Sequence, residues 1–319
     1  MRQLLTFGNY LKGKFKDKVY KVPISISGFT CPNIDGTTAR GGCTFCENDS
    51  FSPSLNKAQP LKKFTLNLNS KTNPFLDKQL LQLEQQFYAL KNHFQTQMGA
   101  NKFLVYFQSF TNTYAPLDTL KALYEKALSF DGVVGLSIGT RSDSITDEIL
   151  DYLVELSRDK EIWIEYGIQS VFDETLQTIN RGHDSKNVEE WIKKTKARGL
   201  NVCGHIIYGL PNETKDMMMT TTHRAIDWGI DSIKIHPMYI VKRTALANQF
   251  YKDEVDVITQ EDYIDMVVQT LQILPENISI QRITAGIDND TLLAPMWCKN
   301  KQQQLDKIRK ALNIVGLKY

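Results

Sequence analysis

Apolar runs rich in β-branched residues alternate with helical patterns over most of the 319-residue chain, and this alternation predicts an α/β fold. Six such runs occur, fewer than the eight strands of a closed TIM-type barrel. Past about residue 245 the alternation stops and helical patterns take over. We therefore expect a partial (β/α)6 TIM-type barrel over residues 1–245, including a basic N-terminal arm. Residues 246–319 should form a C-terminal helical extension packed on this barrel.

The predicted strands are short apolar segments separated by helical patterns. They are Val22–Ser27, Phe103–Phe107, Val133–Ile138, Ile162–Ile168, Val202–Tyr208 and Ser232–Ile240. Repeated strand–helix units are joined by right-handed crossovers, so these strands should run parallel and end at one edge of the sheet. The active sites of barrel enzymes lie at that edge, beyond the carboxyl ends of the strands.

The predicted helices follow from apolar periodicity and capping residues. Leucine and phenylalanine recur at intervals of three and four residues within Phe75–Gln97, which predicts a long amphipathic helix. Thr146 suits the N-cap of the helix after the third strand, and Gly199 can end a helix over Asn187–Arg198. The other predicted segments are helices at Leu117–Leu128, Thr214–Trp228, Gln260–Leu274 and Gln302–Val315, and a polar connector at Lys57–Lys71. Ile278–Ile283 and a turn rich in Gly, Asp and Asn join the last two helices.

Three cysteines lie close together after the first predicted strand. Eleven residues separate Cys31 from Cys43, and two separate Cys43 from Cys46. Three thiolates can ligate three corners of a cubic iron–sulfur cluster and leave the fourth iron open. An open iron lets a cluster act on a bound small molecule as well as carry electrons. Cys203 and Cys298 lie far away in the sequence, and we expect both to be buried small apolar side chains.

The composition is that of an ordinary globular protein. Hydrophobic residues make up 42% of the chain, mean hydropathy is −0.32, and the sequence contains no apolar stretch of about 18 residues that would predict a membrane span. Met1–Tyr10 is too polar for a signal peptide. We expect a cytoplasmic protein without membrane contact, in which clustered cysteines are metal ligands and not disulfides.

The net charge of +2 neither requires nor excludes a nucleic-acid partner. Basic residues nevertheless crowd both ends of the chain. They are Lys12, Lys14, Lys16, Lys18 and Lys21 in the N-terminal arm, and Lys299, Lys301, Lys307, Arg309, Lys310 and Lys318 near the C-terminus. The charge pattern alone favours two solvated basic faces, and the alternative is contact with RNA phosphates.

Polar residues follow or end the predicted strands, where a barrel would place an active site. They are Gln108–Tyr114, Thr140–Asp143, Glu165, Gly167 and Gln169, Asn180–His183, Gly209–Glu213, and Lys234 with His236. Each has an ordinary structural explanation when taken singly: Glu165 as a hydrogen-bond partner, Tyr114 as packing, His183 and His205 as satisfied structural histidines. Their recurrence at one end of the barrel, in register with the cysteines, favours an active site.

Taken in order, these segments resemble the motifs of the radical S-adenosylmethionine (SAM) superfamily. The resemblance is to its Elongator-catalytic-subunit-like branch and to bacterial radical SAM proteins of about this length, and it runs from Ile24 to Leu246 with a further likeness at Ala294–Trp297. The motifs are Cys31 to Cys46, Tyr106–Pro116, Gly139–Asp143, Glu165–Ser170, Asn180–His183 and Gly204–Pro211. The long first cysteine gap departs from most of the superfamily but is similar to the Elongator-like branch. The acetyltransferase domain of that branch and a second cysteine triad have no counterpart in this sequence.

The resemblance implies that Cys31, Cys43 and Cys46 ligate a [4Fe–4S] cluster whose open iron binds the amine and carboxylate of SAM. One electron then cleaves SAM to a 5′-deoxyadenosyl radical, and the protein orients and shields it. The implied SAM-binding residues are Phe45 and Ile207 near adenine, Gln108 and Ser109 facing the methionyl amine, Glu165 accepting from the ribose, Gln169, and Arg181 pairing with the carboxylate. Tyr114 joins the cysteines as a catalytic candidate.

The same resemblance suggests tRNA as the substrate. Relatives in this branch often modify RNA, notably the wobble uridine of tRNA, and a splayed loop base suits the mouth of a barrel. The leading hypothesis is conversion of a carboxymethylaminomethyl group on uridine C5 to an aminomethyl group, because a radical centre next to nitrogen is stabilised. The expected partners are tRNA and an electron donor such as flavodoxin or ferredoxin.

Three alternatives stay open at this level. A structural zinc site would use the cysteines with a histidine, although a closely spaced fourth ligand is absent from the sequence. A protein that only transfers electrons would normally supply four cysteines. A radical SAM enzyme could instead act on a small molecule or a protein. Cys298 is also a candidate methyl-transfer cysteine, although no pair of such cysteines is evident.

Overall fold

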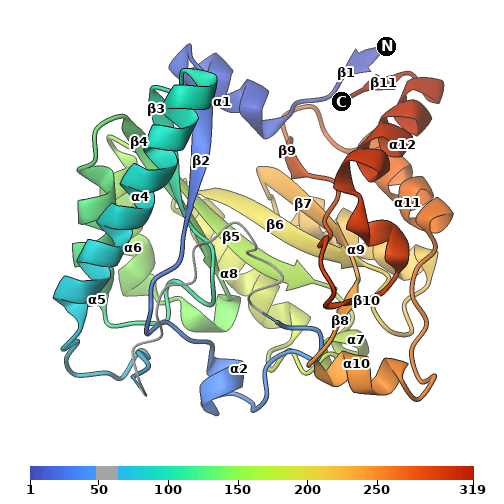
Figure 1. The fold of residues 1–319 in the computed structure, drawn as a ribbon, viewed down its shortest axis with the longest axis horizontal. Coiled ribbons are helices and arrows are strands. Elements are labelled where there is room, and N and C mark those ends of the chain that lie inside the picture. Colours follow the sequence, from blue (N-terminus) through green and yellow to red (C-terminus); the bar gives the residue numbers. More distant parts are fainter. Residues whose placement is uncertain (48–63) are drawn as a thin grey trace.

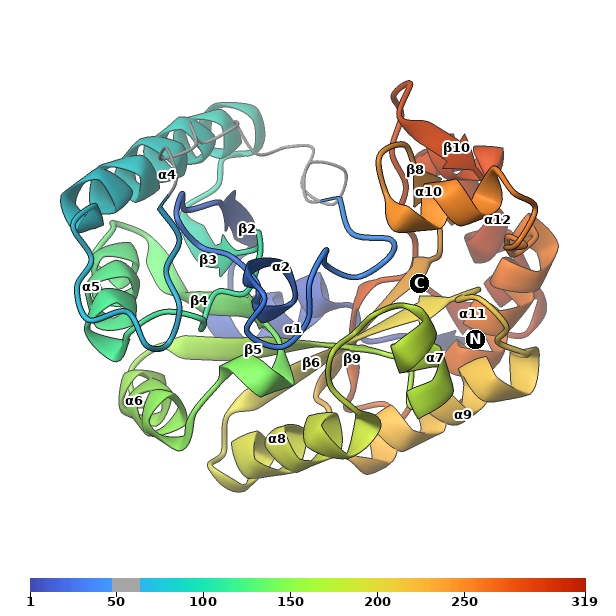
Figure 2. The same ribbon diagram turned by 90° about the horizontal axis from the view of Figure 1, so that it is seen from below.

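The computed structural model describes residues 1–47 and 64–319. Within these residues, seven parallel strands form one sheet that curves into a half-barrel (Figures 1 and 2). In sheet order they are β2 (Val19–Ile24), β3 (Lys102–Phe107), β4 (Val133–Thr140), β5 (Glu161–Gln169), β6 (Asn201–Tyr208), β7 (Ser232–Pro237) and β9 (Ser279–Arg282). Neighbouring strands follow one another along the chain, as repeated right-handed strand–helix units require. The predicted partial barrel is confirmed.

The strand count of six was wrong by one. β9 lies within Ile278–Ile283, which the sequence predicted as a connector between two helices. It pairs with β7 from Ser232 opposite Ser279 to Lys234 opposite Arg282. Four residues are too few to show a clear period, so only pairing with β7 identifies this segment as a strand.

The first predicted strand was placed three residues too late. β2 begins at Val19 and includes Pro23, which is tolerated because β2 is an edge strand with one free side. After β2 the chain leaves the sheet, and the Ser25 N–H donates to Gln86 Oε1 of the covering helix at 3.1 Å. Ser25, which the sequence placed inside the strand, therefore hydrogen-bonds to a helix side chain.

The last predicted strand is broken in two. β7 stops at Pro237, which lacks the N–H needed to continue a ladder. The following strand, β8 (Ile240–Val241), pairs antiparallel with β10 (Leu292–Ala294) instead. Residues 238 and 239 thereby turn the chain at the carboxyl end of the sheet, where Met238 and Tyr239 line a pocket.

Helices cover the outer face of the half-barrel (Figure 2). Those the sequence predicted all lie within two residues of the predicted bounds. They are α4 (Leu76–Met98), α5 (Leu117–Leu128), α6 (Asp147–Ser157), α8 (Ser185–Ala197), α9 (Lys215–Asp227), α11 (Gln260–Ile273) and α12 (Lys301–Ile314). The Thr146 side chain accepts from the Ile149 N–H, as its N-cap role requires, and Gly199 has a φ of +78°. Among these helices and the rest of the described residues, none is both long and apolar enough to cross a membrane.

The shorter elements were not predicted individually. They are β1 (Arg2–Gln3), α1 (Phe7–Phe15), α2 (Pro32–Asp35), η1 (Ser142–Ser144), α7 (Asp173–Thr178), α10 (Ala245–Phe250), η2 (Met296–Lys299) and β11 (Leu317–Lys318). β1 pairs with β11, so the two chain ends lie side by side (Figure 1). The predicted connector Lys57–Lys71 lies partly outside the described residues, and its described part is coil and turn.

The basic N-terminal arm is mostly the helix α1, which closes the amino end of the half-barrel. Phe7 and Tyr10 pack edge-on against Trp163, with ring centroids 4.9 and 5.6 Å apart, and Lys14 pairs with Glu161 at the start of β5. Figure 1 shows α1 at one end of the sheet and α2, within the cysteine segment, at the other. The lysines of α1 therefore lie at the end of the sheet opposite the expected active site, whereas Lys21, in β2, pairs with Glu165.

Candidate active site

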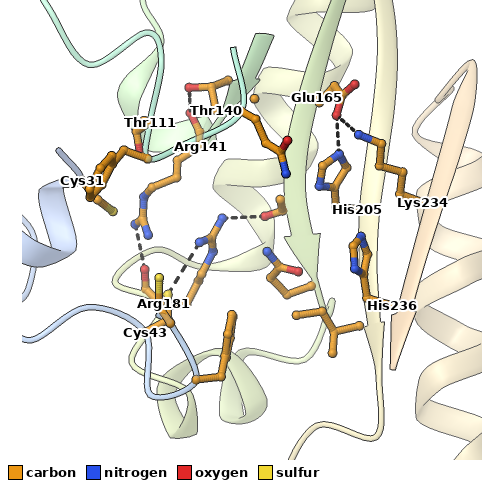
Figure 3. Close-up of a pocket in the computed structure, with 18 of the residues that line it drawn as sticks. Cys31, Cys43, Thr111, Thr140, Arg141, Glu165, Arg181, His205, Lys234 and His236 are labelled. Atoms are coloured by element: carbon orange, nitrogen blue, oxygen red, sulfur yellow. Dashed lines mark hydrogen bonds and ion pairs between the residues drawn. The ribbon is translucent and has the colours of Figure 1, made fainter. Parts of the chain in front are cut away.

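A pocket opens at the carboxyl end of the sheet, and residues of the cysteine segment (Cys31–Cys46) and of β3 to β7 line it (Figure 3). Nine of the predicted site residues line it: Cys31, Cys43, Phe45, Cys46, Gln108, Glu165, Gln169, Arg181 and Ile207. These residues are up to 176 positions apart in sequence, from Cys31 to Ile207, and the barrel topology brings them to one cavity.

The long gap between the first two cysteines is filled by α2 and its turn. Cys31 is the N-cap of α2, and Pro32 occupies the first helical position, where no backbone N–H is needed. The buried Asn33 side chain fastens this turn to the loop after α7: its Nδ2 donates to the Arg181 carbonyl at 2.9 Å and lies 3.7 Å from Cys43 Sγ. The Asn33 amide is thus one of the contacts that tie the cysteine segment to the barrel.

The three cysteines suit an iron–sulfur cluster. All are free thiols that line the pocket, and the Arg181 Nη1 lies 3.7 Å from Cys43 Sγ, where it can donate to a ligating sulfur. Burial, with the neighbouring Cys43 and Cys31, raises the pKa of Cys46 to about 12, so deprotonation of this thiol depends on a bound metal.

The same geometry argues against a single zinc ion. Sulfurs bound to one tetrahedral zinc lie about 3.8 Å apart, from zinc–sulfur bonds of about 2.3 Å. Among the described residues, the cysteine triad is not a set of ligand atoms within 4.8 Å of one another, whereas Glu165, Cys203 and His205 are.

Two arginines beside the cysteines carry buried N–H groups without partners. Arg181 Nη2 donates to the Gly167 carbonyl at 2.7 Å, and Arg141 Nη2 donates to the Arg181 carbonyl at 2.7 Å. Among the described residues, Arg141 Nη1 and Arg181 Nε have no hydrogen-bond partner. Guanidinium donors of this kind suit a carboxylate, so the site fits the methionyl end of SAM. Arg141 belongs to the Gly139–Asp143 motif, but the sequence did not predict it as a site residue.

An apolar wall stands next to the cysteines. Phe45 and Ile207 belong to one buried cluster that also contains Leu210 and Met238. Such a surface suits the faces of an adenine ring. Gln169, at the end of β5, has a φ of +67° and lines the pocket beside this wall.

Two predicted residues are not among those that line the pocket. Tyr114 is 2% exposed, and its hydroxyl donates to Thr37 Oγ1 at 2.8 Å. Thr37 lies in the turn between Cys31 and Cys43, so Tyr114 supports the cysteine segment by this hydrogen bond without lining the pocket. Ser109 is buried next to the pocket residue Gln108. The sequence identifies the segment of these two residues but not the direction in which each side chain points.

Glu165 is the centre of a buried ion-pair network at the inner end of the pocket. Its Oε1 accepts from Lys21 Nζ at 2.6 Å and from Ser137. Its Oε2 accepts from Lys234 and from His205 Nε2 at 2.8 Å (Figure 3). Burial acts to raise the pKa of Glu165, but Lys21 and Lys234 outweigh it and hold this pKa well below its usual value. Four donors fill the four acceptor positions of the carboxylate, which leaves none for a ribose hydroxyl.

The two remaining cysteines are buried, as expected. Cys203 packs in an apolar cluster with Phe7 and Trp163, and Cys298 packs with Tyr239. Neither is among the residues that line the pocket.

Comparison with known proteins agrees with this site. Residues 34–225 match the Radical SAM superfamily, and residues 230–313 match the Radical_SAM C-terminal domain. The uncharacterized protein YtqA of Bacillus subtilis (strain 168) is 36% identical over 311 residues, covering 98% of this chain and 90% of YtqA. A tRNA uridine(34) acetyltransferase of Methanocaldococcus infernus is 28% identical over 160 residues, covering 48% of this chain and 29% of that protein.

A solved structure shares the fold. The archaeal Methanocaldococcus infernus Elp3 with an N-terminal deletion superposes with a TM-score of 0.59 at 17% sequence identity, covering 94% of this chain and 65% of that chain. The full-length similarity and the superfamily match agree with the cysteine triad at the carboxyl end of a half-barrel. The chain belongs to the radical SAM superfamily, whose cofactors are a [4Fe–4S] cluster and SAM.

Proposed function

We propose that this radical SAM enzyme modifies tRNA, and that it converts a carboxymethylaminomethyl group on C5 of the wobble uridine into an aminomethyl group. The observation that carries the proposal is a pocket with the cysteine triad at one end and a cation-rich barrel interior at the other. The partial match to a tRNA uridine(34) acetyltransferase supports the choice of a wobble uridine. A loop base splayed out of the anticodon can enter such a pocket from the mouth.

Named side chains would hold the cofactors. Cys31, Cys43 and Cys46 would ligate the cluster, and the free N–H groups of Arg141 and Arg181 would bind the SAM carboxylate. When bound, the cluster and SAM supply a 5′-deoxyadenosyl radical that abstracts a hydrogen atom. The buried walls of the pocket keep water away from the reacting groups.

The proposed reaction balances as follows. The substrate loses a hydrogen atom from the methylene between nitrogen and carboxylate, then a proton and an electron, which leaves an imine. Water hydrolyses the imine to the aminomethyl group and glyoxylate. The electron that is released equals the one that SAM cleavage consumes, so the net products are the amine, glyoxylate, methionine and 5′-deoxyadenosine. A flavodoxin or ferredoxin would supply the first electron.

The test uses an anticodon stem-loop whose carboxymethyl carbon carries deuterium. We expect the reconstituted enzyme with SAM and reductant to form the aminomethyl stem-loop, glyoxylate and deuterated 5′-deoxyadenosine. A Cys43→Ala variant should form none of them, since one cluster ligand is lost. Formation of 5′-deoxyadenosine without deuterium, and without change to the stem-loop, would contradict the proposal and favour a small-molecule or protein substrate.

A further inference from the structure

The end of the pocket away from the cysteines is built from polar side chains that are basic or neutral, apart from Glu165. Tyr106 of β3, His205 of β6, Lys234 and His236 of β7 and Arg282 of β9 line it. Figure 3 shows His205, Lys234 and His236 on the opposite side of the pocket from Cys31 and Cys43. This end of the pocket therefore lies beyond the residues that would hold the cluster.

Positive charge exceeds negative charge in this region. Lys21, Lys234 and Arg282 are cationic, and Glu165 is the one acidic residue that lines the pocket within the described chain. Glu165 is already saturated by its four donors. No hydrogen bond or ion pair formed by the described residues engages the guanidinium of Arg282 or the ring of His236. Arg282 is therefore an uncompensated cation facing the cavity.

The same cluster does not suit a metal cation. Ligand atoms of Glu165, Cys203 and His205 do lie within 4.8 Å of one another. Lys21 and Lys234, however, occupy the Glu165 oxygens, and burial raises the pKa of the Cys203 thiol to about 12. Two ammonium groups repel a divalent ion at this position, so the net charge favours an anion.

The pocket thus has two ends that can bind a carboxylate. The first is formed by Arg141 and Arg181 beside Cys43, and the single carboxylate of SAM can occupy it. The second end needs another anion. The proposed substrate carries one, and it is bonded directly to the carbon that loses hydrogen, so anchoring this carboxylate would also position the reacting C–H bond.

We infer that Arg282, with His236 and Lys234, forms a subsite that binds the carboxylate of the substrate side chain. The inference rests on the proposed function and names the group by which the substrate is recognised. The guanidinium can bind the carboxylate with two parallel hydrogen bonds, and His236 can donate a third. The product has lost the carboxylate and carries an ammonium group, which the same cations repel. The subsite would therefore hold the substrate and favour release of the product.

The test compares two free nucleosides, 5-carboxymethylaminomethyluridine and 5-aminomethyluridine, on protein loaded with cluster and SAM but without reductant. Dissociation constants are measured anaerobically for wild type, Arg282→Gln and Arg282→Lys. Arg158→Gln is the matched control, because Arg158 is an exposed arginine at the end of α6 that is not among the pocket residues. Iron content and melting temperature of each variant check that it is folded and loaded.

We expect wild type and Arg158→Gln to bind the carboxylate nucleoside at least about tenfold more tightly than the aminomethyl nucleoside. Arg282→Gln should lose this preference, and Arg282→Lys should keep part of it. Equal binding of the two nucleosides by wild type, no measurable binding of either, or an unchanged preference in Arg282→Gln would overturn the subsite.

Turnover of the stem-loop is scored separately from nucleoside binding. Turnover with an unchanged preference in Arg282→Gln would leave the proposed function standing and remove the subsite. A preference that depends on Arg282 without any turnover of the stem-loop would support a carboxylate subsite and contradict the tRNA substrate.

Discussion

At the scale of single residues, Glu165 is the most constrained side chain of the barrel interior. Its side chain is fully buried, and it balances Lys21 and Lys234 on opposite oxygens. Removal of one partner from such a network leaves a buried charge without compensation, which costs more than the network itself contributes. The network also keeps Lys234 at the wall of the pocket.

Glu165→Gln should therefore lower the free energy of unfolding by about 3 to 5 kcal/mol. Denaturant unfolding of the apoprotein measures this change. Glu148→Gln serves as the control, because Glu148 is exposed on α6 and should change stability by less than about 0.5 kcal/mol. Similar effects of the two substitutions would show that the buried charges are not coupled as the distances indicate.

Lys234 gives the proposed reaction a pH limit. Burial lowers the pKa of Lys234 to about 8, against the opposing effect of Glu165. The groups that face it are Glu165 of β5, Lys21 of β2, Tyr106 of β3, Cys203 and His205 of β6, and Arg282 of β9. Because of this lowered pKa, the Lys234 ammonium loses its proton near pH 8. Its attraction for a carboxylate therefore weakens above about pH 8.

We expect kcat/KM for the carboxymethylaminomethyl stem-loop to fall as the pH rises above about 8. Lys234→Arg should move this limb to higher pH, because guanidinium stays protonated throughout the range. The pH profile of kcat/KM, taken from initial rates at substrate concentrations below KM, measures both. A limb at the same pH in wild type and Lys234→Arg would assign the titration to another group.

At the scale of elements, the cysteine segment depends on a few contacts with the loop after α7. Asn33 donates to the Arg181 carbonyl and accepts from Arg141 Nη2 at 3.3 Å. Gly182 follows with a φ of +81°, and a Cβ at this position would lie 2.2 Å from Asn33 Oδ1. The glycine thus allows the amide to reach both arginines.

Asn33→Ala should loosen the cysteine segment, since buried donors and acceptors lose their partner at a cost of about 1 to 3 kcal/mol. We expect the reconstituted variant to lose its cluster several-fold faster in the presence of a chelator, measured by visible absorbance. Asn313→Ala, at an exposed position of α12, is the control. Equal rates of cluster loss would mean that Asn33 does not hold the segment.

At the scale of the whole molecule, the two ends of the half-barrel have different tasks. α1 closes the amino end, and the pocket opens at the carboxyl end (Figure 1). The lysines of α1, which the sequence suggested as possible RNA contacts, therefore lie away from the mouth of the pocket. Lys242 and Arg243 are exposed and follow the pocket residues Met238 and Tyr239 by only a few positions. For the proposed tRNA substrate, we expect these two side chains to contact the phosphates.

The double substitution Lys242→Gln and Arg243→Gln should weaken binding of unmodified tRNA. It should also reduce the steepness of the plot of log K against log salt concentration by about 1 to 2. Filter binding over a series of salt concentrations measures both. The matched control is Lys12→Gln with Lys16→Gln, two exposed lysines on or next to α1. A larger effect of the α1 pair would place the RNA at the amino end and contradict this orientation.

Local patterns in the sequence determined the class of fold and the cysteine triad. Strand and helix periods are visible over ten residues or so, and the spacing of Cys31, Cys43 and Cys46 is a property of the chain alone. For this reason the half-barrel and its main helices agree with the structure, in which nine of the predicted site residues line one pocket.

Tertiary contacts decided the rest. β9 is too short to be recognised without its partner β7. Because Arg282 lies at the end of β9, the sequence did not predict it as a pocket residue either. Arg141 and Tyr114 lie in equally polar segments, yet one faces the cavity and the other supports the cysteine turn. The direction of a side chain and the balance of buried charges depend on neighbours brought together by folding, and one-dimensional patterns do not contain that information.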